Sequence, residues 1–308
     1  MTEPIENSLS VIIPARNEPY LQKTIDDIFK NSRGPATDVI TVLDGFWPNP
    51  PLKDDDRLHI IHRGESRGMR DAITSAVEMS RAKYIMKMDA HCMVSEGFDL
   101  ELMKASQPNW VQVPRRKRLL PETWELEIQE GRPDIDYMYL TYPYADAKHD
   151  IFGAGDKKYG LHGKNWDTLN KREDLKGILI DDLMTAQGSA YFMEKAYFKE
   201  LELLDQSTYG GFRDEFLEVG MKCWLSGGRV VVNKNCFYSH WHKNRGRGYN
   251  LPPEESKWEM WMKPNAWHKQ TKSIEWLIGH FEERFGEIWP KGWEEIAKES
   301  NKDADRSV

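Results

Sequence analysis

Residues 9–14 read LSVIIP, a short β-branched run that ends at a proline. A run of this kind predicts a buried strand that the proline terminates. Residues 20–31 carry apolar side chains at helical spacing, and residues 38–43 form a second β-branched run. The succession of strand, helix and strand predicts a βαβ unit, and therefore a parallel sheet.

The same pattern occurs a second time, with strands predicted over residues 58–61 and 83–88 and a helix over 69–80. In open parallel sheets, ligands bind beyond the carboxyl ends of the strands. We therefore expect one crevice where these strands end. The polar residues that follow the strands are Pro14 to Glu18, Asp44-Gly45 and Asp89-Ala90-His91.

Regular alternation stops after a further strand, predicted over residues 110–114. We predict one α/β domain over residues 1–250, in which residues 115–180 form an insertion that shapes the acceptor side. Tryptophans and amphipathic patterns mark residues 251–308, which are predicted to form a helical C-terminal extension.

Composition excludes several classes of protein. The 308 residues have a net charge of -7 and contain no apolar run near the ~18–20 residues that a membrane helix needs. The N-terminus lacks a signal-peptide pattern, so we expect a cytoplasmic protein without membrane attachment. The three cysteines, Cys92, Cys223 and Cys236, have no CxxC spacing, which argues against a disulfide scaffold or a thiolate zinc site.

The tripeptide Asp89-Ala90-His91 is the sharpest chemical signal. Alternate residues of an extended backbone point the same way, so the carboxylate and the imidazole can face one cation. This donor set suits Mn²⁺ or a related divalent ion. A third ligand is available in His240 or His242, which follow a later predicted strand. The competing interpretation is a capping aspartate and a histidine that bonds to backbone groups.

Other candidates are weaker one by one. Asp44 and Glu18 stand where acidic side chains meet ribose hydroxyls or a base edge, and Arg70 begins a helix where a guanidinium can reach phosphate. Asp214 and Glu215 precede a predicted helix and can supply a base or bind a sugar hydroxyl. The basic stretches 115–118 and 243–249, which we expect to be flexible, can clamp a diphosphate or meet an anionic acceptor; solvated charge is the competing interpretation.

Together these segments resemble the nucleotide-sugar glycosyltransferases of the GT-A fold, family 2-like, and most closely the catalytic domains of polypeptide N-acetylgalactosaminyltransferases. The matching segments are SVIIPARNE at 10–18, RGMRDA at 67–72, MDAHC at 88–92, QGSAYF at 187–192, YGGFRDEFLE at 209–218 and CFYSHWHK at 236–243.

The resemblance implies a GT-A fold, which is a Rossmann-like, mostly parallel sheet with helices on both faces. It also implies an Asp-x-His motif that binds Mn²⁺ through Asp89, His91 and a third ligand, for which His240 fits best. Phe216 stands where inverting relatives place a catalytic aspartate, which favours a retaining reaction. The implied nucleotide-binding residues are Pro14, Arg16, Glu18, Asp44, Arg70 and Asp89, and the implied catalytic residues are Glu215 and Asp214.

The sequence therefore predicts a metal-dependent transfer of a sugar from a UDP-sugar to a hydroxyl acceptor, which can be a protein, a glycan, a small molecule or a modified DNA base. Two alternatives stay open. A nucleotidyltransferase acting on a sugar phosphate would also use a metal at a strand end. A non-catalytic module that binds sugar nucleotides would keep the same fold.

Overall fold

The computed structural model describes residues 4–141, 161–212, 214–243, 260–261, 263 and 265–285. Some of the predicted segments lie outside these residues. They are the basic loop beyond Lys243, residues 142–160 of the predicted insertion, and most of the predicted extension 251–308.

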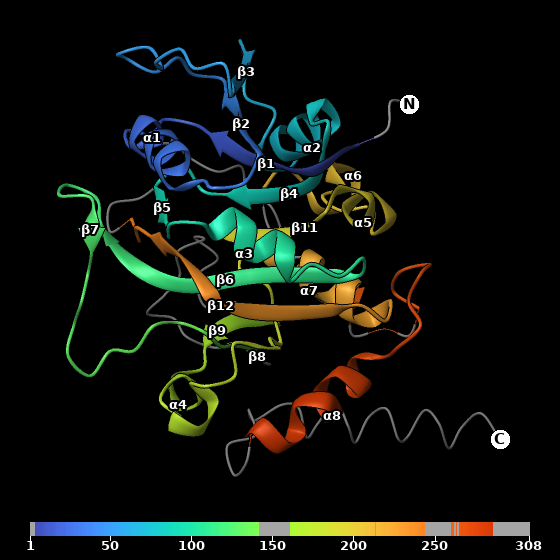
Figure 1. Ribbon diagram of the computed structural model, residues 1–308. Coiled ribbons are helices and arrows are strands. Elements are labelled where there is room, and N and C mark those ends of the chain that lie inside the picture. Colours follow the sequence, from blue (N-terminus) through green and yellow to red (C-terminus); the bar gives the residue numbers. More distant parts are fainter. Residues whose placement is uncertain are drawn as a thin grey trace, which may run out of the picture.

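A central ten-stranded sheet organises the fold (Figure 1). Its order is β10-β12-β6-β11-β4-β1-β2-β3, with β5 paired to β12 and β7 paired to β6. The strands are β1 (Ile5–Ala15), β2 (Ala36–Asp44), β3 (Leu58–Arg63), β4 (Ala82–Met88), β5 (Cys92–Val94), β6 (Trp110–Leu120), β7 (Glu125–Leu126), β10 (Ile180–Asp182), β11 (Ala190–Glu194) and β12 (Arg229–His240). A separate two-stranded sheet joins β8 (Met138–Thr141) to β9 (His162–Asn165).

Six of the strands run in one direction. β1 is parallel to β2 and β4, and β2 is parallel to β3. β11 is antiparallel to both β4 and β6, and β12 is parallel to β6, so β6 and β12 share the direction of β4. The carboxyl ends of these six strands therefore meet at one edge of the sheet, which confirms the predicted mostly parallel α/β fold.

Helices lie on both faces of the sheet, with α3 in front of it and α7 behind it in Figure 1. The helices are α1 (Leu21–Asn31), α2 (Met69–Met79), α3 (Phe98–Lys104), α4 (Asp167–Asn170), α5 (Lys195–Glu200), α6 (Gln206–Tyr209), α7 (Glu215–Leu225) and α8 (Ile274–Phe285), with a 3₁₀ turn η2 at Glu173–Leu175. Because both faces are covered, the six consecutive residues Ser8–Ile13 of β1 are all buried, and Val11, Ile12 and Ile13 are each 0% exposed.

Strands β6 and β12 are longer than predicted. β6 continues past Pro114 to Leu120, because residues Arg115–Arg118 pair with Phe237–His240 of β12. The prediction that residues 115–118 are flexible is therefore wrong, since they belong to a paired strand. The pairing also carries β12 to His240, which brings that histidine to the edge where β4 ends.

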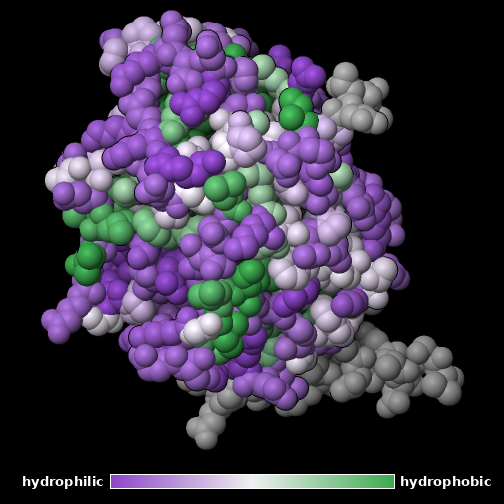
Figure 2. Space-filling view, viewed as in Figure 1, coloured by the Kyte–Doolittle hydropathy of each residue, from purple (hydrophilic) through white to green (hydrophobic). Residues whose placement is uncertain are grey.

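The surface is largely hydrophilic. Figure 2 shows charged and polar side chains interrupted by small apolar patches. Most of the large apolar side chains with high exposure, such as Trp47 at 60% and Ile128 at 90%, are isolated along the chain; Ile178 and Leu179 are adjacent. Among the described helices, none has the length and apolar character needed to cross a membrane. Cys92, Cys223 and Cys236 are buried free thiols.

Helix α8 docks against the edge of the sheet beside β10. The Arg284 guanidinium donates to both carboxylate oxygens of Asp181, at 2.7 and 3.0 Å, and the Tyr137 hydroxyl donates to the same carboxylate at 2.6 Å. The Phe281 ring packs edge-on against Trp224 of α7, with ring centroids 5.7 Å apart. The described part of residues 251–308 thus includes a helix; the division into a domain and an extension stays a prediction.

Replacing Asp181 by alanine should destabilise the chain by about 2–3 kcal/mol, because Arg284 and the Tyr137 hydroxyl lose a buried acceptor. Urea unfolding measures this difference. Burial raises the pKa of Asp181, but the hydrogen bonds from Arg284 and Tyr137 outweigh it and leave the pKa below its usual value. The stabilisation is present above about pH 4 and is lost as the pH falls through the lowered pKa. Equal stability of the two proteins at pH 7 would contradict this prediction.

Candidate metal centre

Three predicted ligands meet where β4 and β12 end. Asp89 and His91 follow β4 directly, and His240 is the last residue of β12. Backbone hydrogen bonds fix the segment: the Asp89 amide donates to the Ser189 carbonyl at 2.9 Å, and the Trp241 amide donates to the His91 carbonyl at 3.2 Å. Two elements far apart in the sequence therefore present their side chains to one point.

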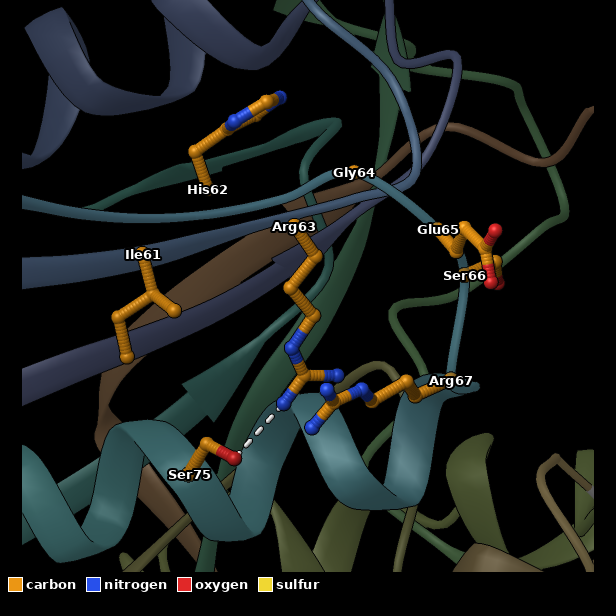
Figure 3. Close-up of a pocket in the computed structure, with 8 residues that line it drawn as sticks. All are labelled: Ile61, His62, Arg63, Gly64, Glu65, Ser66, Arg67 and Ser75. Carbon is orange, nitrogen blue, oxygen red and sulfur yellow. Dashed lines mark hydrogen bonds between the residues drawn. The ribbon is translucent and has the colours of Figure 1, made fainter.

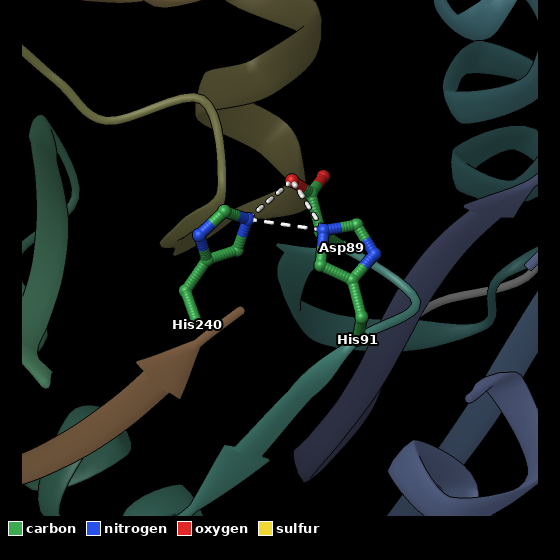
Figure 4. A group of neighbouring side chains, drawn as sticks. All are labelled: Asp89, His91 and His240. Carbon is green, nitrogen blue, oxygen red and sulfur yellow. Dashed lines mark hydrogen bonds and ion pairs between the residues drawn. The ribbon is translucent and has the colours of Figure 1, made fainter. Parts of the chain in front are cut away.

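The donor atoms of Asp89, His91 and His240 face one another, as Figure 4 shows. We call these three residues the triad. His91 Nε2 lies 3.1 Å from His240 Nε2, and His240 Nε2 lies 3.2 Å from Asp89 Oδ2. His91 Nε2 and Asp89 Oδ2 are 4.0 Å apart. One carboxylate oxygen and two imidazole nitrogens within 4.8 Å of one another form a donor set that a single cation can bridge.

Glu18 determines which nitrogen of His91 is available to a metal. Glu18 Oε2 lies 3.1 Å from His91 Nδ1, and Glu18 Oε1 accepts from the Lys243 ammonium at 2.5 Å. A carboxylate accepts hydrogen bonds, so it holds the proton of a neutral His91 ring on Nδ1. The lone pair of Nε2 then points toward His240 and Asp89. Carboxylates hold metal-binding histidines in this way in many metal sites.

The environment keeps Asp89 and His240 in the protonation states that bind metals. Burial lowers the pKa of His240 to about 3, even though Asp89 raises it, so this imidazole is neutral at pH 7. Burial raises the pKa of Asp89, but the charge of Lys87 and the hydrogen bond from His240 outweigh it and lower the pKa well below its usual value. A carboxylate and neutral imidazoles are the ligand forms that Mn²⁺ and related divalent ions require. The residues therefore fit the predicted metal.

His240 and His242, the two candidates for the third ligand, make different contacts. His242 Nε2 hydrogen-bonds the Arg116 guanidinium, and its ring meets that of His240 edge-on at 4.9 Å between centroids. Its nitrogen is not among the three donor atoms that converge with Asp89. The geometry thus favours His240, which the sequence resemblance also favoured over His242.

Lys87 is a site residue that the sequence analysis missed. Its side chain is 1% exposed, and its ammonium lies 2.7 Å from Asp89 Oδ1 and 3.3 Å from Glu215 Oε2. The Lys87 ammonium also donates to the Gly188 carbonyl. A lysine inside a β-branched strand is usually read as a solvated side chain, so only the alternation along β4, which points it to the same side as Asp89, signals this role.

The predicted catalytic residues lie at the start of α7. Glu215 is its first residue, is 6% exposed, and accepts a hydrogen bond from the Tyr191 hydroxyl at 3.0 Å. Burial raises the pKa of Glu215, although Lys87 lowers it. Asp214 precedes the helix with a positive φ of 60°, and its carbonyl accepts from the Glu218 amide at 2.8 Å. Through Lys87, Glu215 is connected to the triad; the catalytic roles of both residues stay predictions.

Asp44 anchors the loop that follows β3. Its Oδ1 accepts from the Arg67 amide at 2.9 Å and from Arg63 at 3.2 Å, while its Oδ2 accepts from the Ser66 hydroxyl at 2.6 Å and the Gly68 amide at 3.0 Å. Burial raises the pKa of Asp44, but these bonds outweigh it and lower the pKa. Asp44 therefore fixes the conformation of the loop by accepting hydrogen bonds from Ser66, Arg67 and Gly68.

A cavity of 570 Å³ lies along the same loop (Figure 3). The Arg63 and Arg67 guanidinium groups lie side by side there, and Arg63 donates to the Ser75 hydroxyl at 2.7 Å. None of the triad residues lines this cavity. The lining residues are Ile61, His62, Arg63, Gly64, Glu65, Ser66, Arg67 and Ser75.

The remaining predicted nucleotide-binding residues occupy different environments. Arg16 reaches the Ser66 hydroxyl at 3.0 Å and so lies over the loop that Asp44 anchors. Pro14 lies within β1, paired with Val42. Arg70 is 0% exposed; it pairs with Glu218 and stacks over the Tyr209 ring at 4.7 Å. The structure therefore places Arg16 near Asp44 and Arg70 in the interior; the nucleotide-binding roles stay predictions.

Comparisons with known proteins agree with this architecture. Residues 10–124 match the sequence model of glycosyl transferase family 2. A putative polypeptide N-acetylgalactosaminyltransferase 13 of Drosophila melanogaster is 24% identical over 277 residues, which cover 82% of this chain and 45% of that protein.

Two solved structures are similar to this fold. The crystal structure of GalNAc-T7 with UDP, GalNAc and Mn²⁺ aligns at a TM-score of 0.59 and 16% identity, covering 80% of this chain and 45% of that one. The structure of S. aureus TarS residues 1–349 aligns at a TM-score of 0.46 and 13% identity, covering 76% and 60%.

These matches confirm the resemblance to family 2-like glycosyltransferases of the GT-A fold, and the match to GalNAc-T7 confirms the α/β fold. The family match runs from Ser10 within β1 to Trp124 beyond the end of β6, so it includes Asp89 and His91 but not His240. The chain spans 45% of the length of both the Drosophila protein and GalNAc-T7, so its own reaction and substrates are proposals.

Replacing His240 by alanine should abolish high-affinity binding of Mn²⁺ at pH 7.5, because the triad loses one of its three donors. Electron paramagnetic resonance of free Mn²⁺ measures the bound fraction directly. The matched control is His242→Ala, two residues further along, which should bind Mn²⁺ as the wild type does. Loss of binding in the control and retention in His240→Ala would reverse the assignment.

Replacing Glu18 by glutamine should weaken Mn²⁺ binding about 10–100-fold without abolishing it, because the amide no longer holds the His91 proton on Nδ1 as a carboxylate does. The measurement is the same titration with metal alone, in the absence of nucleotide. Unchanged affinity would show that Glu18 acts only on another ligand.

Proposed function

We propose that this chain is a metal-dependent glycosyltransferase that moves a sugar from a UDP-sugar to a hydroxyl acceptor. The observation that carries the proposal is the triad itself: a carboxylate oxygen and two imidazole nitrogens at the carboxyl edge of a GT-A sheet. Ligands of open parallel sheets bind at this edge, so a metal held there meets a nucleotide that lies across the strand ends.

The donor is proposed to be a UDP-sugar because GalNAc-T7, whose fold is similar, was solved with UDP, GalNAc and Mn²⁺. Asp89, His91 and His240 would hold Mn²⁺ or another divalent ion. When bound, such an ion neutralises the charge that develops on a diphosphate leaving group. The proposed nucleotide contacts are Pro14, Arg16, Glu18, Asp44 and Asp89. Arg70 is buried against Glu218, so we propose that it supports the start of α2 and does not touch the nucleotide.

The chain's own residues prepare the reacting centre. The Lys87 ammonium lies 2.7 Å from Asp89 Oδ1, and the other carboxylate oxygen, Oδ2, faces the two histidines. Glu18 orients His91, and Lys243 supplies a positive charge beside Glu18. These groups are fixed before any substrate arrives, so orientation and electrostatic stabilisation cost little reorganisation during the reaction.

Glu215 and Asp214 are proposed to act on the sugar. Glu215 is the first residue of α7, and the Lys87 ammonium links its carboxylate to that of Asp89. Phe216 stands where inverting relatives have a catalytic aspartate, which supports transfer with retention. The acceptor is proposed only as a hydroxyl group, and the cytoplasmic location rests on the sequence prediction alone.

Incubation with a panel of UDP-sugars and Mn²⁺ should release UDP from one of them, because slow donor hydrolysis requires no acceptor. Removal of the metal with EDTA should stop the release, and Asp89→Ala should lower it at least about 100-fold through loss of a metal ligand. The control is Glu96→Ala, an exposed carboxylate in an ion pair with Arg33, which should retain full release.

Other outcomes separate the alternatives. Release of pyrophosphate from a nucleoside triphosphate and a sugar phosphate would identify a nucleotidyltransferase instead. Metal-dependent UDP binding in calorimetry, without UDP release in the presence of any acceptor, would identify a non-catalytic binding module. Metal-independent UDP release at the wild-type rate would contradict the proposal.

A further inference from the structure

Basic side chains of β6 lie beside the triad. In the parallel pairing of β6 with β12, Arg118 stands opposite His240 and Arg116 stands opposite Tyr238. Opposite residues of neighbouring strands present their side chains to the same face of a sheet. The Arg116 guanidinium hydrogen-bonds His242, two residues beyond the triad's His240. Positive charge is thus built into the face of the sheet that carries the metal ligands.

The basic side chains on the two faces of β6 differ in whether they form ion pairs. Arg115 forms a two-fold ion pair with Asp136, with both N–O distances at 2.7 Å, and Lys117 pairs with Asp134 at 3.4 Å. Within the described ranges, Arg116 and Arg118 have no carboxylate within 4.0 Å, and neither does the nearby Arg132. The Arg115 and Lys117 charges are neutralised inside the protein, whereas those on the triad face are not.

The unneutralised charges repel one another. Burial, followed by the charges of Arg132 and Arg116, lowers the pKa of Arg118, although Glu127 and Asp134 act to raise it. Three like charges with no ion-pair partner among the described residues cost folding free energy, which a bound anion would recover.

Two buried hydrogen-bond donors beside the triad also lack acceptors. Gln187 Oε1 accepts from Arg116 Nη1 at 3.2 Å and from the Tyr238 hydroxyl at 2.8 Å, which fixes the amide so that its Nε2 group is a donor. Gln187 Nε2 and Arg116 Nε have no hydrogen-bond partner among the residues that the structure describes, and the two residues are 3% and 7% exposed. A buried donor without an acceptor is costly, so these atoms indicate a ligand that brings oxygen acceptors.

The position of these groups distinguishes them from the predicted nucleotide side. Arg16 and Asp44 belong to the ends of β1 and β2, whereas Arg116 and Arg118 belong to β6. In the sheet, β11 and β4 separate β6 from β1. The end of β12 pairs with β5, which follows His91, on one side and with residues Arg115–Arg118 of β6 on the other. Arg118 therefore lies across His240 from His91, on the side away from Arg16 and Asp44, which is where we expect the acceptor.

We propose that Arg116, Arg118 and Arg132, with Gln187, form a subsite for a phosphate group carried by the acceptor, an inference that rests on the proposed glycosyl transfer. Guanidinium groups match the geometry of phosphate oxygens. Three positive charges are balanced better by a phosphate than by a single carboxylate. The acceptor is then a molecule that carries its reacting hydroxyl near a phosphomonoester or phosphodiester.

The test is calorimetric binding of methyl phosphate to the full chain at fixed ionic strength in EDTA, so that no metal and no turnover are involved. Wild type should bind it saturably, and Arg116→Gln/Arg118→Gln should bind at least about tenfold more weakly. The matched control, Arg115→Gln/Lys117→Gln on the same strand, should bind as wild type does. Because Arg116 is buried, the single variant Arg118→Gln, checked by circular dichroism, should also show weakened binding.

A second titration, with Mn²⁺ and UDP present, locates the subsite. Methyl phosphate should bind with unchanged affinity, forming a ternary complex. Displacement by UDP would assign the arginines to the diphosphate and overturn the proposal, as would equal binding by wild type and all three variants. Tighter binding of methyl phosphate than of dimethyl phosphate identifies a phosphomonoester acceptor, and the reverse identifies a phosphodiester.

The outcome is independent of the proposed reaction. If methyl phosphate binds but no UDP-sugar releases UDP, the glycosyl transfer fails while the anion site stands. If UDP is released but methyl phosphate does not bind, the reaction stands and the phosphate subsite is wrong.

Discussion

The convergence of two imidazole nitrogens and one carboxylate oxygen at the ends of β4 and β12 is the constraint on which the site depends. His91 and His240 bring their Nε2 atoms to 3.1 Å from each other, a distance at which two neutral rings can share only one proton. Burial lowers the pKa of His240 and so disfavours a second proton there. A cation that accepts both lone pairs resolves this arrangement, and the parallel pairing of β6 with β12 is what delivers His240 to it.

The charged side chains around the triad fall into two groups, which differ in whether they form ion pairs. One group is paired: Glu18 with Lys243, Asp89 with Lys87, and Lys87 with Glu215. The other group lies on β6, where Arg116 and Arg118 have no carboxylate partner within the described part of the chain. Paired groups are already organised to orient ligands and metal, whereas unpaired ones acquire their counter-charge from a substrate.

Much of the fold follows from local patterns. The β-branched runs at 9–14 and 38–43 and the helix between them predict the parallel sheet, and the polar residues after each strand predict the edge at which the site lies. The sequence also singled out Asp89 and His91, with His240 or His242 as the third ligand, because a metal site needs such side chains on extended backbone; the family resemblance favoured His240.

The rest depends on long-range pairing that local patterns do not contain. Pro114 signals a strand end, yet β6 continues to Leu120 because β12 provides the partner. The buried position of Lys87 depends on Asp89 and on Glu215, 128 residues away. The contact between Glu18 and His91 joins segments 73 residues apart, and only the pairing of β1 with β4 in the folded sheet brings them together.

The most direct measurement is a crystal structure of the chain soaked with MnCl₂ and UDP, recorded with X-rays at the manganese absorption edge. The account predicts a single strong anomalous peak bound by Asp89, His91 and His240, with the diphosphate on its β1–β4 side. A peak bound elsewhere, or a triad that carries no manganese while UDP occupies the strand ends, would contradict it.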